Sequence, residues 1–306
     1  MGDVGGLSGT TRSTDGAGLS RTWRLLDEEA HSGVWNMAED LALLEGEGEG
    51  DGALPVLRLY SWDRPTLSLG YTQNADEVVD FEGAARLGIP IVRRPTGGGS
   101  VLHEGTLEVT YSVVADEADL PSSVVEAYRV IAQALARALV RLGLRAGFAE
   151  TIPARGDWSA VCFETPTRFE LLVEGRKAVG SAQCRRNGRV LQHGAIPLHF
   201  DPVRAAEVMK ADDKARLAER LAEHATGLGD VSDRPFSQEN VRAALVWAFA
   251  DTFECELRPG DLTAEEWALR DHLVRLNVPG PIRPGMGTGP ADLRTARGRL
   301  RSGRNA

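Results

Sequence analysis

The stretch Arg93-Arg-Pro-Thr-Gly-Gly-Gly-Ser-Val-Leu-His-Glu104 decides the fold of this chain, because a run of three glycines here joins two apolar segments. The first segment is Ile89–Val92. The second is Leu107–Val114, whose alternation of apolar and polar residues predicts a strand buried on one face. Glycine permits positive φ and close approach to a ligand, so this loop can surround a bound group with backbone N–H donors. A flexible hairpin loop is the alternative interpretation.

Composition limits the class of protein. With 306 residues, of which 42% are apolar and 26% charged, the chain can bury a sizeable core in one large domain. Its net charge of −9 and pI near 5.3 give no reason to expect a nucleic acid as partner. No apolar run could span a bilayer, and the N-terminus lacks the pattern of a signal peptide. We therefore expect a cytoplasmic protein that does not associate with membranes.

The cysteines and histidines predict neither disulfides nor a metal site. Cys162, Cys184 and Cys255 make an odd number and show no CxxC spacing, which argues against a disulfide framework and a zinc site. Several histidines also lack the spacing of metal ligands. They are His31, His199, His224 and His272.

Local signals place the secondary structure. Structure is expected to begin at Thr22–Leu26, and Ser32 caps an amphipathic helix over Trp35–Glu45. Glu174–Gly175 and Asn187–Gly188 are expected hairpin turns. The other expected strands are Leu54–Tyr60, Thr66–Gly70, Phe169–Val173, Lys177–Val179 and Val190–His193. The other expected helices are Val78–Leu87, Pro202–Met209, Asp213–His224, Ser237–Phe253, a helix from Ser123 to Arg141 with a Ser123/Glu126 capping box, and Thr263–Leu276 with a Thr263/Glu266 capping box.

The chain divides into an arm, a folded domain and a tail. Residues 1–20 are rich in Gly, Ser, Thr and Asp and are expected to form a disordered arm. Residues 21–277 are expected to form one domain, with a core over residues 22–200 and a helical C-terminal part over residues 201–277. Residues 278–306 are rich in Pro, Gly and Arg and are expected to form a disordered basic tail.

The glycine-rich stretch Arg93–Glu104 resembles the R-R-x-T-G-G-G-x-V-x-H-[DE] signature of the lipoate and octanoate protein ligase/transferase family. Asn36–Leu44 resembles the N-terminal helix of that family. Gly175–Gln183, followed by Leu191–Ile196, resembles its substrate-lysine segment. The resemblance implies an α+β biotin/lipoate protein ligase (class II aaRS and biotin synthetase-like) fold, with mixed β-sheets flanked by helices. It assigns residues 21–277 to the BPL/LPL catalytic domain.

Cys162 and Lys177 are the residues that carry the predicted chemistry. Cys162 precedes one strand and Lys177 begins the next, so the turn between the strands can bring them together. A nearby ammonium lowers the pKa of a thiol, which is ordinarily ~8.5, by stabilising the thiolate. Such a thiolate can take an acyl group from another thioester and pass it to an amine, so no ATP or other cofactor is needed. A small buried hydrophobe is the alternative role of a lone cysteine.

The segment Val161–Pro166 resembles the motif of the cysteine-dependent octanoyltransferases of the LipM type, and Cys162 and Lys177 are separated as in that family. The resemblance implies octanoyl-acyl-carrier protein as donor in endogenous lipoate biosynthesis. It implies lysines of lipoyl domains as acceptors, in the glycine cleavage H protein and the acyltransferase subunits of 2-oxoacid dehydrogenases. Cys162 would carry the octanoyl thioester, and Lys177 would activate the thiol and donate to the oxyanion. Implied substrate-binding residues are Arg94, Thr96, Gly97, Gly98, Gly99, His103, Gly180 and Ser181.

Some side chains keep two interpretations. His103 is either a general base or a residue that holds the loop by hydrogen bonds, whereas His193 in a strand is interpreted as structural. Arg93 and Arg94 either bind the phosphate of a pantetheine arm or pair with acidic side chains. Cys184 is the rival thiol. An apolar slot for an octanoyl chain would contribute roughly 5 kcal/mol at ~0.8 kcal/mol per methylene. Candidates for its lining are Leu67, Leu69, Val101 and Val179.

Three other functions stay open. An ATP-dependent lipoate-protein ligase would use the glycine loop for an acyl-adenylate phosphate and would need Mg²⁺, but Cys162 argues against it. An octanoyl amidotransferase between lipoyl domains would use the same cysteine chemistry. A lipoyl-domain binding module without activity would leave Cys162 and Lys177 unexplained.

Overall fold

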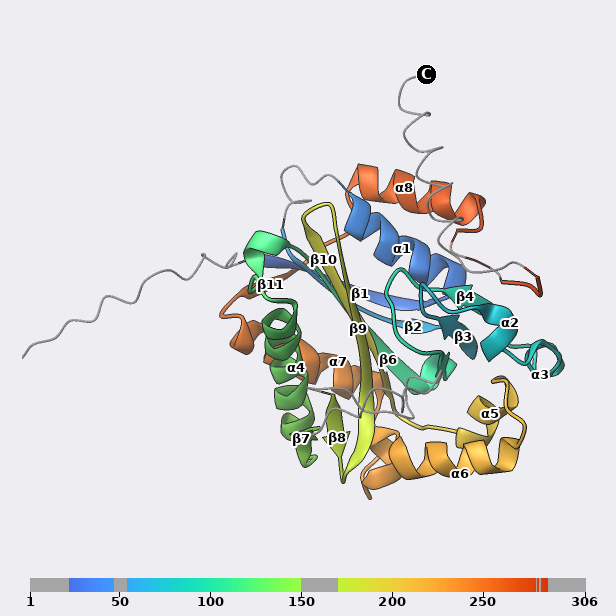
Figure 1. The fold of residues 1–306 in the computed structure, drawn as a ribbon. Coiled ribbons are helices and arrows are strands. Elements are labelled where there is room, and N and C mark those ends of the chain that lie inside the picture. The colour runs from blue at the N-terminus through green and yellow to red at the C-terminus, as the bar shows by residue number, and fades with distance from the viewer. Residues whose placement is uncertain (1–21, 47–53, 150–169, 279, 281, 286–306) are drawn as a thin grey trace, which may run out of the picture.

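A computed structural model describes residues 22–46, 54–149, 170–278, 280 and 282–285. Eight strands form one sheet and three form a second, smaller sheet (Figure 1). In spatial order the large sheet contains β11 (Glu256–Pro259), β1 (Thr22–His31), β2 (Val56–Trp62), β6 (Glu108–Asp116), β10 (Arg189–Pro197), β9 (Arg176–Arg186), β8 (Leu171–Val173) and β7 (Ala146–Phe148). The small sheet contains β4 (Ile91–Arg93), β3 (Thr66–Leu69) and β5 (Val101–His103).

Helices cover both faces of the large sheet (Figure 1). Leu57, Leu59 and Tyr111 point to the face that α4 and α7 cover, while Val56 and Val114 point to the face that α1 and α8 cover. This alternation is the period of two that strand geometry imposes. The helices are α1 (Gly33–Glu45), α2 (Ala75–Val78), α3 (Phe81–Arg86), α4 (Val124–Arg141), α5 (Pro202–Glu207), α6 (Lys214–His224), α7 (Gln238–Thr252) and α8 (Ala264–Arg275).

The small sheet has its own apolar cluster. Leu67 and Leu69 of β3 pack with residues of the short helices, among them Ala205 of α5 and Leu217 of α6. The single helix expected over Val78–Leu87 is wrong, because the chain breaks after α2. The N–H of Asp80 donates to the carbonyl of Val208 at 3.0 Å, and the Asp80 carboxylate then caps α3.

The helix predicted behind Ser32 is confirmed. The Ser32 hydroxyl accepts a hydrogen bond from the N–H of Trp35, as a serine N-cap does. Both apolar and acidic side chains of α1 are buried, including Glu39 and Asp40. A buried carboxylate needs a partner, so this helix must lie against basic or hydrogen-bonding groups of the sheet.

The central strand β6 differs from its prediction. The pattern predicted burial on one face, but Thr110 and Ser112 are as buried as the apolar residues between them. Their hydroxyls are satisfied, since Thr110 accepts from Nε1 of Trp62 at 2.9 Å and Ser112 donates to Asp40 at 2.9 Å. The second face is therefore a buried polar face, which alternation alone does not distinguish from a solvent-exposed one.

The glycine stretch is not a hairpin loop. β4 pairs with β3 in parallel and β5 pairs with β3 antiparallel, so the two strands flanking the glycines lie on opposite sides of β3. The second apolar segment, β6, belongs to the other sheet. The stretch therefore crosses from one edge of the small sheet to the other and leads the chain into the large sheet.

Both predicted hairpin turns are confirmed. Glu174 and Gly175 have φ of 51° and 78°, and Asn187 and Gly188 have φ of 52° and 77°, the left-handed pair that tight hairpins require. They join β8 to β9 and β9 to β10. The first of these hairpins positions Lys177 opposite Leu172.

One of the two predicted capping boxes is confirmed. At α8 the Thr263 hydroxyl accepts from the N–H of Glu266, and the Glu266 carboxylate accepts from the N–H of Thr263. At α4 the Ser123 hydroxyl accepts from the N–H of Glu126, but the Glu126 carboxylate pairs with Arg129 instead. That cap therefore acts in one direction only.

The C-terminal part departs from the prediction in two ways. The sequence predicts only helices there, yet β11 pairs in parallel with β1 and extends the large sheet. The predicted tail begins at residue 278, but Val278 packs in the cluster of α1 and α8, and the N–H of Ile282 donates to the carbonyl of Ile91 at 2.9 Å. The packed region therefore continues past residue 277. The predicted arm 1–20 and residues 286–306 of the tail lie outside the described residues.

Within the part of the chain that the structure describes, no helix combines the length and apolarity needed to cross a membrane.

Candidate active site

A pocket with about 360 Å³ of empty space, open solvent included, lies where the small sheet meets β9 and β10. Its wall is mainly apolar and includes Met37, Trp62, Val101, Gly180, His193 and Gly194. Of the four residues expected to line an acyl slot only Val101 is on this wall, since Leu67 and Leu69 lie in the cluster of the small sheet and Val179 in that of the large sheet.

His103 is bonded at both ring nitrogens. Nδ1 lies 2.7 Å from Oε1 of Glu108, and Nε2 lies 2.9 Å from the Ser68 hydroxyl. The ring also stacks on Trp62 with 3.8 Å between centroids. Of the two roles considered for His103, this geometry supports holding the wall of the pocket.

The two arginines of the signature hold the glycine loop. Arg94 donates from Nη2 to the carbonyls of Gly97 at 2.7 Å and Gly99 at 2.6 Å. Arg93 donates from Nη1 to the carbonyls of Gly70 and Gln73, each at 2.8 Å. Bonds to backbone carbonyls are a role that the sequence did not predict for either arginine. Because Arg94 also lines the pocket, its guanidinium both shapes the loop and faces the site.

The glycine loop packs tightly on β3. A Cβ at Gly70 would lie 2.0 Å from the carbonyl oxygen of Gly98, and Gly98 itself has φ of 90°. Both positions therefore require glycine. Gly97, Gly98 and Gly99 were expected to line the mouth of the site, but they are not part of the pocket wall. Their backbone is held next to it by Arg94.

Thr96 lies behind the wall and contacts it through His193. The Thr96 hydroxyl is 2.7 Å from Nε2 of His193, and Nδ1 of His193 is 2.8 Å from Oδ2 of Asp40. All three side chains are buried. The prediction that His193 has satisfied hydrogen bonds is confirmed, but the ring also lines the pocket, which the prediction did not include.

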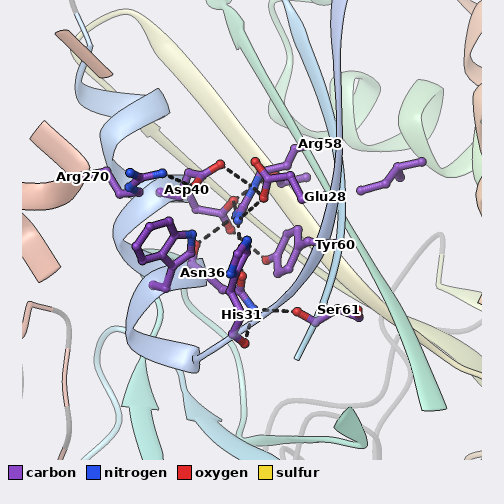
Figure 2. A network of polar contacts seen from close by, with 12 residues as sticks. Glu28, His31, Asn36, Asp40, Arg58, Tyr60, Ser61 and Arg270 are labelled. Carbon is purple, nitrogen blue, oxygen red and sulfur yellow. Dashed lines mark hydrogen bonds and ion pairs between the residues drawn. The ribbon is translucent and has the colours of Figure 1, made fainter. Parts of the chain in front are cut away.

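Asp40 belongs to a buried network between α1 and β2 (Figure 2). Its Oδ1 accepts from Nη1 of Arg58 at 2.8 Å, and the Tyr60 hydroxyl donates to its Oδ2 at 3.1 Å. Burial works to raise the pKa of Asp40, but the hydrogen bond from His193 and the charge of Arg58 outweigh it and lower that pKa. Asp40 is therefore an anion at neutral pH. Glu28 and Glu39 also pair with Arg58, at 2.8 and 3.1 Å.

Gly180 and Ser181, both expected to bind substrate, are on the pocket wall. The Tyr111 hydroxyl donates to Oγ of Ser181 at 2.8 Å. Burial raises the pKa of Tyr111 to about 12, so its hydroxyl keeps its proton and remains a donor. Gly194 faces them across the strand pair, and a Cβ there would lie 2.6 Å from the Gly180 carbonyl. The floor of the pocket thus depends on a glycine at this position.

Cys162 lies outside the described residues, and Lys177 is the described member of the predicted catalytic pair. Lys177 is fully buried, and its Nζ donates to Oε1 of Glu170 at 2.5 Å. Its carbonyl accepts from the N–H of Thr226 at 3.0 Å. Lys177 is not on the pocket wall, although Gly180, three residues further along the same strand, is. An ammonium held by a buried carboxylate has a fixed position.

Cys184, the rival thiol, is poorly suited to act as a nucleophile. Burial raises the pKa of Cys184 to about 11, so the thiol keeps its proton at neutral pH. Burial raises the pKa of Cys255 to about 11 as well. Among the described residues, no group of three or more His, Cys, Asp or Glu side chains could hold a metal ion.

Several residues of the site were not predicted from the sequence. Asp40 was the one with a signal, because an acidic residue interrupts an otherwise apolar helix face there. The others gave none, since apolar, aromatic and small residues in helices and strands are interpreted first as core. They are Met37, Tyr60, Trp62, Ser68 and Thr110.

Comparisons with known proteins agree with this architecture. The profile of the lipoyl protein ligase A/B catalytic domain matches residues 32–250. This chain belongs to that family. Octanoyltransferase LipM of Kyrpidia tusciae is 44% identical over 264 residues, which cover 83% of this chain and 95% of that protein. Octanoyltransferase LipM of Bacillus subtilis is 37% identical over 265 residues, covering 83% and 94%. The resemblance to LipM-type octanoyltransferases of the lipoyl ligase family, and with it the assignment as an acyltransferase, is confirmed.

Solved structures of the lipoyl ligase family confirm the predicted fold. A bipartite lipoate protein ligase from Thermoplasma acidophilum, studied with its E2 lipoyl domain, superposes with a TM-score of 0.71 at 26% identity, covering 88% of this chain and 96% of that one. A lipoate-protein ligase A bound with ATP superposes with a TM-score of 0.69 at 28% identity, covering 83% and 94%.

Proposed function

We propose that this protein is a cytoplasmic octanoyltransferase of lipoate biosynthesis. It takes the octanoyl group from octanoyl-acyl-carrier protein and delivers it to a lysine of lipoyl domains, such as the glycine cleavage H protein and the acyltransferase subunits of 2-oxoacid dehydrogenases. The observation that carries the proposal is the similarity to octanoyltransferases named LipM, over more than nine-tenths of their length. The Thermoplasma acidophilum ligase has an E2 lipoyl domain as its partner, which supports the choice of acceptor.

The reaction proceeds in two steps through Cys162. The Cys162 thiolate attacks the thioester carbonyl of the donor, a C–S bond forms, and the carrier thiolate leaves. The amine of the acceptor lysine then attacks the acyl-enzyme, a C–N bond forms, and the Cys162 thiolate leaves. Lys177 activates the cysteine and donates to the oxyanion, and its position on β9 with Glu170 as counter-ion supports a fixed ammonium there.

The pocket supplies the acyl site. Its wall is largely apolar, which suits an octanoyl chain, and four of the predicted substrate-binding residues, Arg94, His103, Gly180 and Ser181, line it. Thr96 and the loop Gly97–Gly99 lie next to this wall and support the acyl group indirectly.

An ATP-dependent lipoate-protein ligase is the second candidate, because one related solved structure is a lipoate-protein ligase A bound with ATP. In that reaction the glycine loop would contact a phosphate and Cys162 would have no chemical role. Amidotransfer between two lipoyl domains is the third candidate and would keep the cysteine chemistry, with an octanoylated lipoyl domain as donor.

Intact mass spectrometry separates these candidates. The purified protein is incubated with octanoyl-acyl-carrier protein and no ATP, in parallel with Cys162→Ala and Cys184→Ala. We expect a hydroxylamine-sensitive octanoyl adduct on the wild type and on Cys184→Ala, and none on Cys162→Ala. Cys184→Ala is the matched control, because it removes the rival thiol.

Two other outcomes would change the assignment. Octanoylation or lipoylation of an acceptor that needs ATP and survives Cys162→Ala would establish the ligase. An adduct formed from an octanoylated H protein but not from octanoyl-acyl-carrier protein would establish the amidotransferase.

A further inference from the structure

The large sheet contributes to the pocket a row of residues that become smaller from β2 to β9. Tyr60 of β2 pairs with Thr110 of β6. Thr110 pairs with Ala195 of β10, and Ala195 pairs with Gly180 of β9. All four line the pocket. Because paired residues lie side by side on one face of a sheet, the space over the sheet is narrowest at β2 and widest at β9.

The burial of the wall changes in the same direction. At the β2 end, Tyr60 and Trp62 are fully buried, and Met37 of α1 is 2% exposed. At the β9 end, Ser181 and Ala182 line the pocket and are partly exposed. Among the described residues of the wall, those at β9 therefore form the open end and those at β2 the closed end.

This geometry fixes the direction of a bound acyl chain. The acyl group is joined through its carbonyl to a protein, either the carrier or the acceptor, which is too large to enter the pocket. The carbonyl therefore stays at the open end, and the methyl end of the chain enters first. β9 also carries Lys177, the cation proposed to act at the carbonyl, which agrees with this direction. The last carbons of the chain then lie at the closed end.

Three large side chains form the closed end, and two of them are fixed by hydrogen bonds. Nε1 of Trp62 donates to the Thr110 hydroxyl at 2.9 Å. The Tyr60 hydroxyl donates to Asp40 at 3.1 Å. The third side chain is Met37, an unbranched thioether that adapts its shape easily. Of the three, Met37 is therefore the one whose size can change without the loss of a hydrogen bond.

Met37 separates the pocket from further apolar residues. It belongs to a buried cluster with Tyr60, Trp62 and Val92, and the partly buried Val34 packs against that cluster. Val92 and Val34 are not on the pocket wall. A shorter side chain at position 37 would therefore extend the pocket toward apolar surface, which favours methylene groups. A larger one would fill the closed end.

We propose that Met37 sets the length of the acyl chain that this protein transfers. The inference rests on the proposed function and extends it, since it assigns a specificity-determining residue at the same site. A closed apolar pocket discriminates against one additional methylene by about 10-fold or more. A methionine side chain extends about three atoms beyond Cβ, so alanine at this position leaves space for about two further methylenes after partial relaxation.

Competition between acyl chains tests this proposal. Carrier protein loaded with hexanoyl, octanoyl, decanoyl or dodecanoyl groups is supplied in equimolar pairs with a lipoyl-domain acceptor, and the products are measured by mass spectrometry. In Met37→Ala the ratio of decanoyl to octanoyl transfer should rise about 10-fold or more over the wild type. In Met37→Phe the ratio of hexanoyl to octanoyl transfer should rise. Met37→Leu conserves volume and should keep the wild-type ratios.

Met209→Ala is the matched control. Met209 is 3% exposed and packs in the cluster of the small sheet, and it is not on the pocket wall. The same atoms are removed from an equally buried position, so both alanine variants should lose stability, but Met209→Ala should keep the wild-type ratios. A role of Met37 in packing alone would lower the transfer of every chain length equally and would leave the ratios unchanged.

An unchanged ratio of decanoyl to octanoyl transfer in Met37→Ala, or the same change in Met209→Ala, would overturn the inference. Met37→Phe decides the question if Met37→Ala does not fold. If the wild type requires ATP and a free acid, the proposed donor is wrong, and the same ratios are measured with free acids of these chain lengths.

If the wild type transfers no acyl group by either route, the proposed function fails, and calorimetric binding of octanoate and decanoate replaces the transfer assay. A gain in affinity for decanoate relative to octanoate in Met37→Ala would still support the inference. Binding of neither acid to the wild type or to Met37→Ala would overturn it.

Discussion

Two fully buried cations, Arg58 and Lys177, hold different positions in the same large sheet. Arg58 is in β2, in the middle of the sheet, and three carboxyl groups from two other elements surround it: Glu28, Glu39 and Asp40. Lys177 is in β9, next to the short strands at the edge, and its Nζ is bonded to Glu170 at 2.5 Å.

The difference indicates what each cation does. Arg58 presents a rigid fork of donors, which suits several acceptors at fixed angles, and Tyr60 lies under its guanidinium at 4.0 Å. Its network joins β1, α1 and β2 and includes Asp40 (Figure 2). Lysine is a compact charge that suits one site of developing negative charge. We therefore assign Arg58 to stability and propose a role in the reaction for Lys177.

Arg58→Met gives the largest effect that this assignment predicts. The side chain is replaced by an apolar one of similar length, which leaves buried carboxylates without their cation. We expect the free energy of unfolding to fall by about 3–5 kcal/mol. Urea denaturation followed by circular dichroism measures it. A loss below about 1 kcal/mol would mean that the network contributes little to stability.

Lys177→Met tests the other half of the comparison. We expect octanoyl transfer to fall about 10²–10³-fold, since the ammonium no longer stabilises the thiolate or the oxyanion. Glu170 loses its cation in this variant, so stability falls too. The double variant Lys177→Met/Glu170→Leu separates the two effects, because it removes the buried carboxylate and should recover stability without recovering activity. Recovery of activity would contradict a chemical role for Lys177.

The sequence predicted Lys177 but not Arg58, and the reason is physical. Lys177 directly follows a tight turn and lies within Gly175–Gln183, which resembles the substrate-lysine segment of the family, so local signals locate it. Arg58 stands in the apolar run Leu54–Tyr60, where a charged residue is interpreted as one that points to solvent. Its partners on α1 are 18 or more residues away, and a pairing across that distance depends on how the helix lies on the sheet.

The same limit applies to the folds of the two sheets. The turns, the cap of α1 and the long helices follow from neighbouring residues and were predicted. The glycine stretch crosses from β4 to β5 because both strands pair with β3, and no local sequence pattern determines that pairing. Burial of the second face of β6 depends likewise on α1, which covers it with polar groups.

Glu39, which pairs with Arg58, should make the stability of this network depend on pH. Burial raises the pKa of Glu39 to about 8 from an ordinary 4.5, although the charge of Arg58 opposes this. Between these two pKa values the folded state holds a proton that the unfolded state has lost. Stability from this group is therefore greatest at low pH and falls as pH rises from about 5 to 8, by up to about 1.4 kcal/mol per unit.

Glu39→Gln should remove that dependence. We expect the difference in unfolding free energy between wild type and variant to change steadily between about pH 5 and 8, and the measurement is urea denaturation at each pH. Asp40 affects stability in the opposite direction, because its pKa is lowered in the folded state. Its contribution to stability is lost only as pH falls through that folded-state pKa. Parallel curves for wild type and Glu39→Gln over this range would show that Glu39 is ionised throughout.

Arg145→Ala is expected to have the smallest effect. It tests whether the effects at Arg58 and Lys177 arise because those two cations are buried. Arg145 pairs with Glu174 at 2.7 Å, and Glu174 lies in the turn that precedes Lys177. The side chain of Arg145 is 85% exposed. An exposed ion pair contributes little to stability, because water and salt screen its charges. The free energy of unfolding should therefore change by about 0.5 kcal/mol or less. Octanoyl transfer should stay at the wild-type rate. Urea denaturation at low and high salt measures the first, and the acyl-transfer assay the second. A loss as large as that of Lys177→Met would mean that this edge of the sheet is sensitive to any charge removed from it, and the role of Lys177 would then be structural.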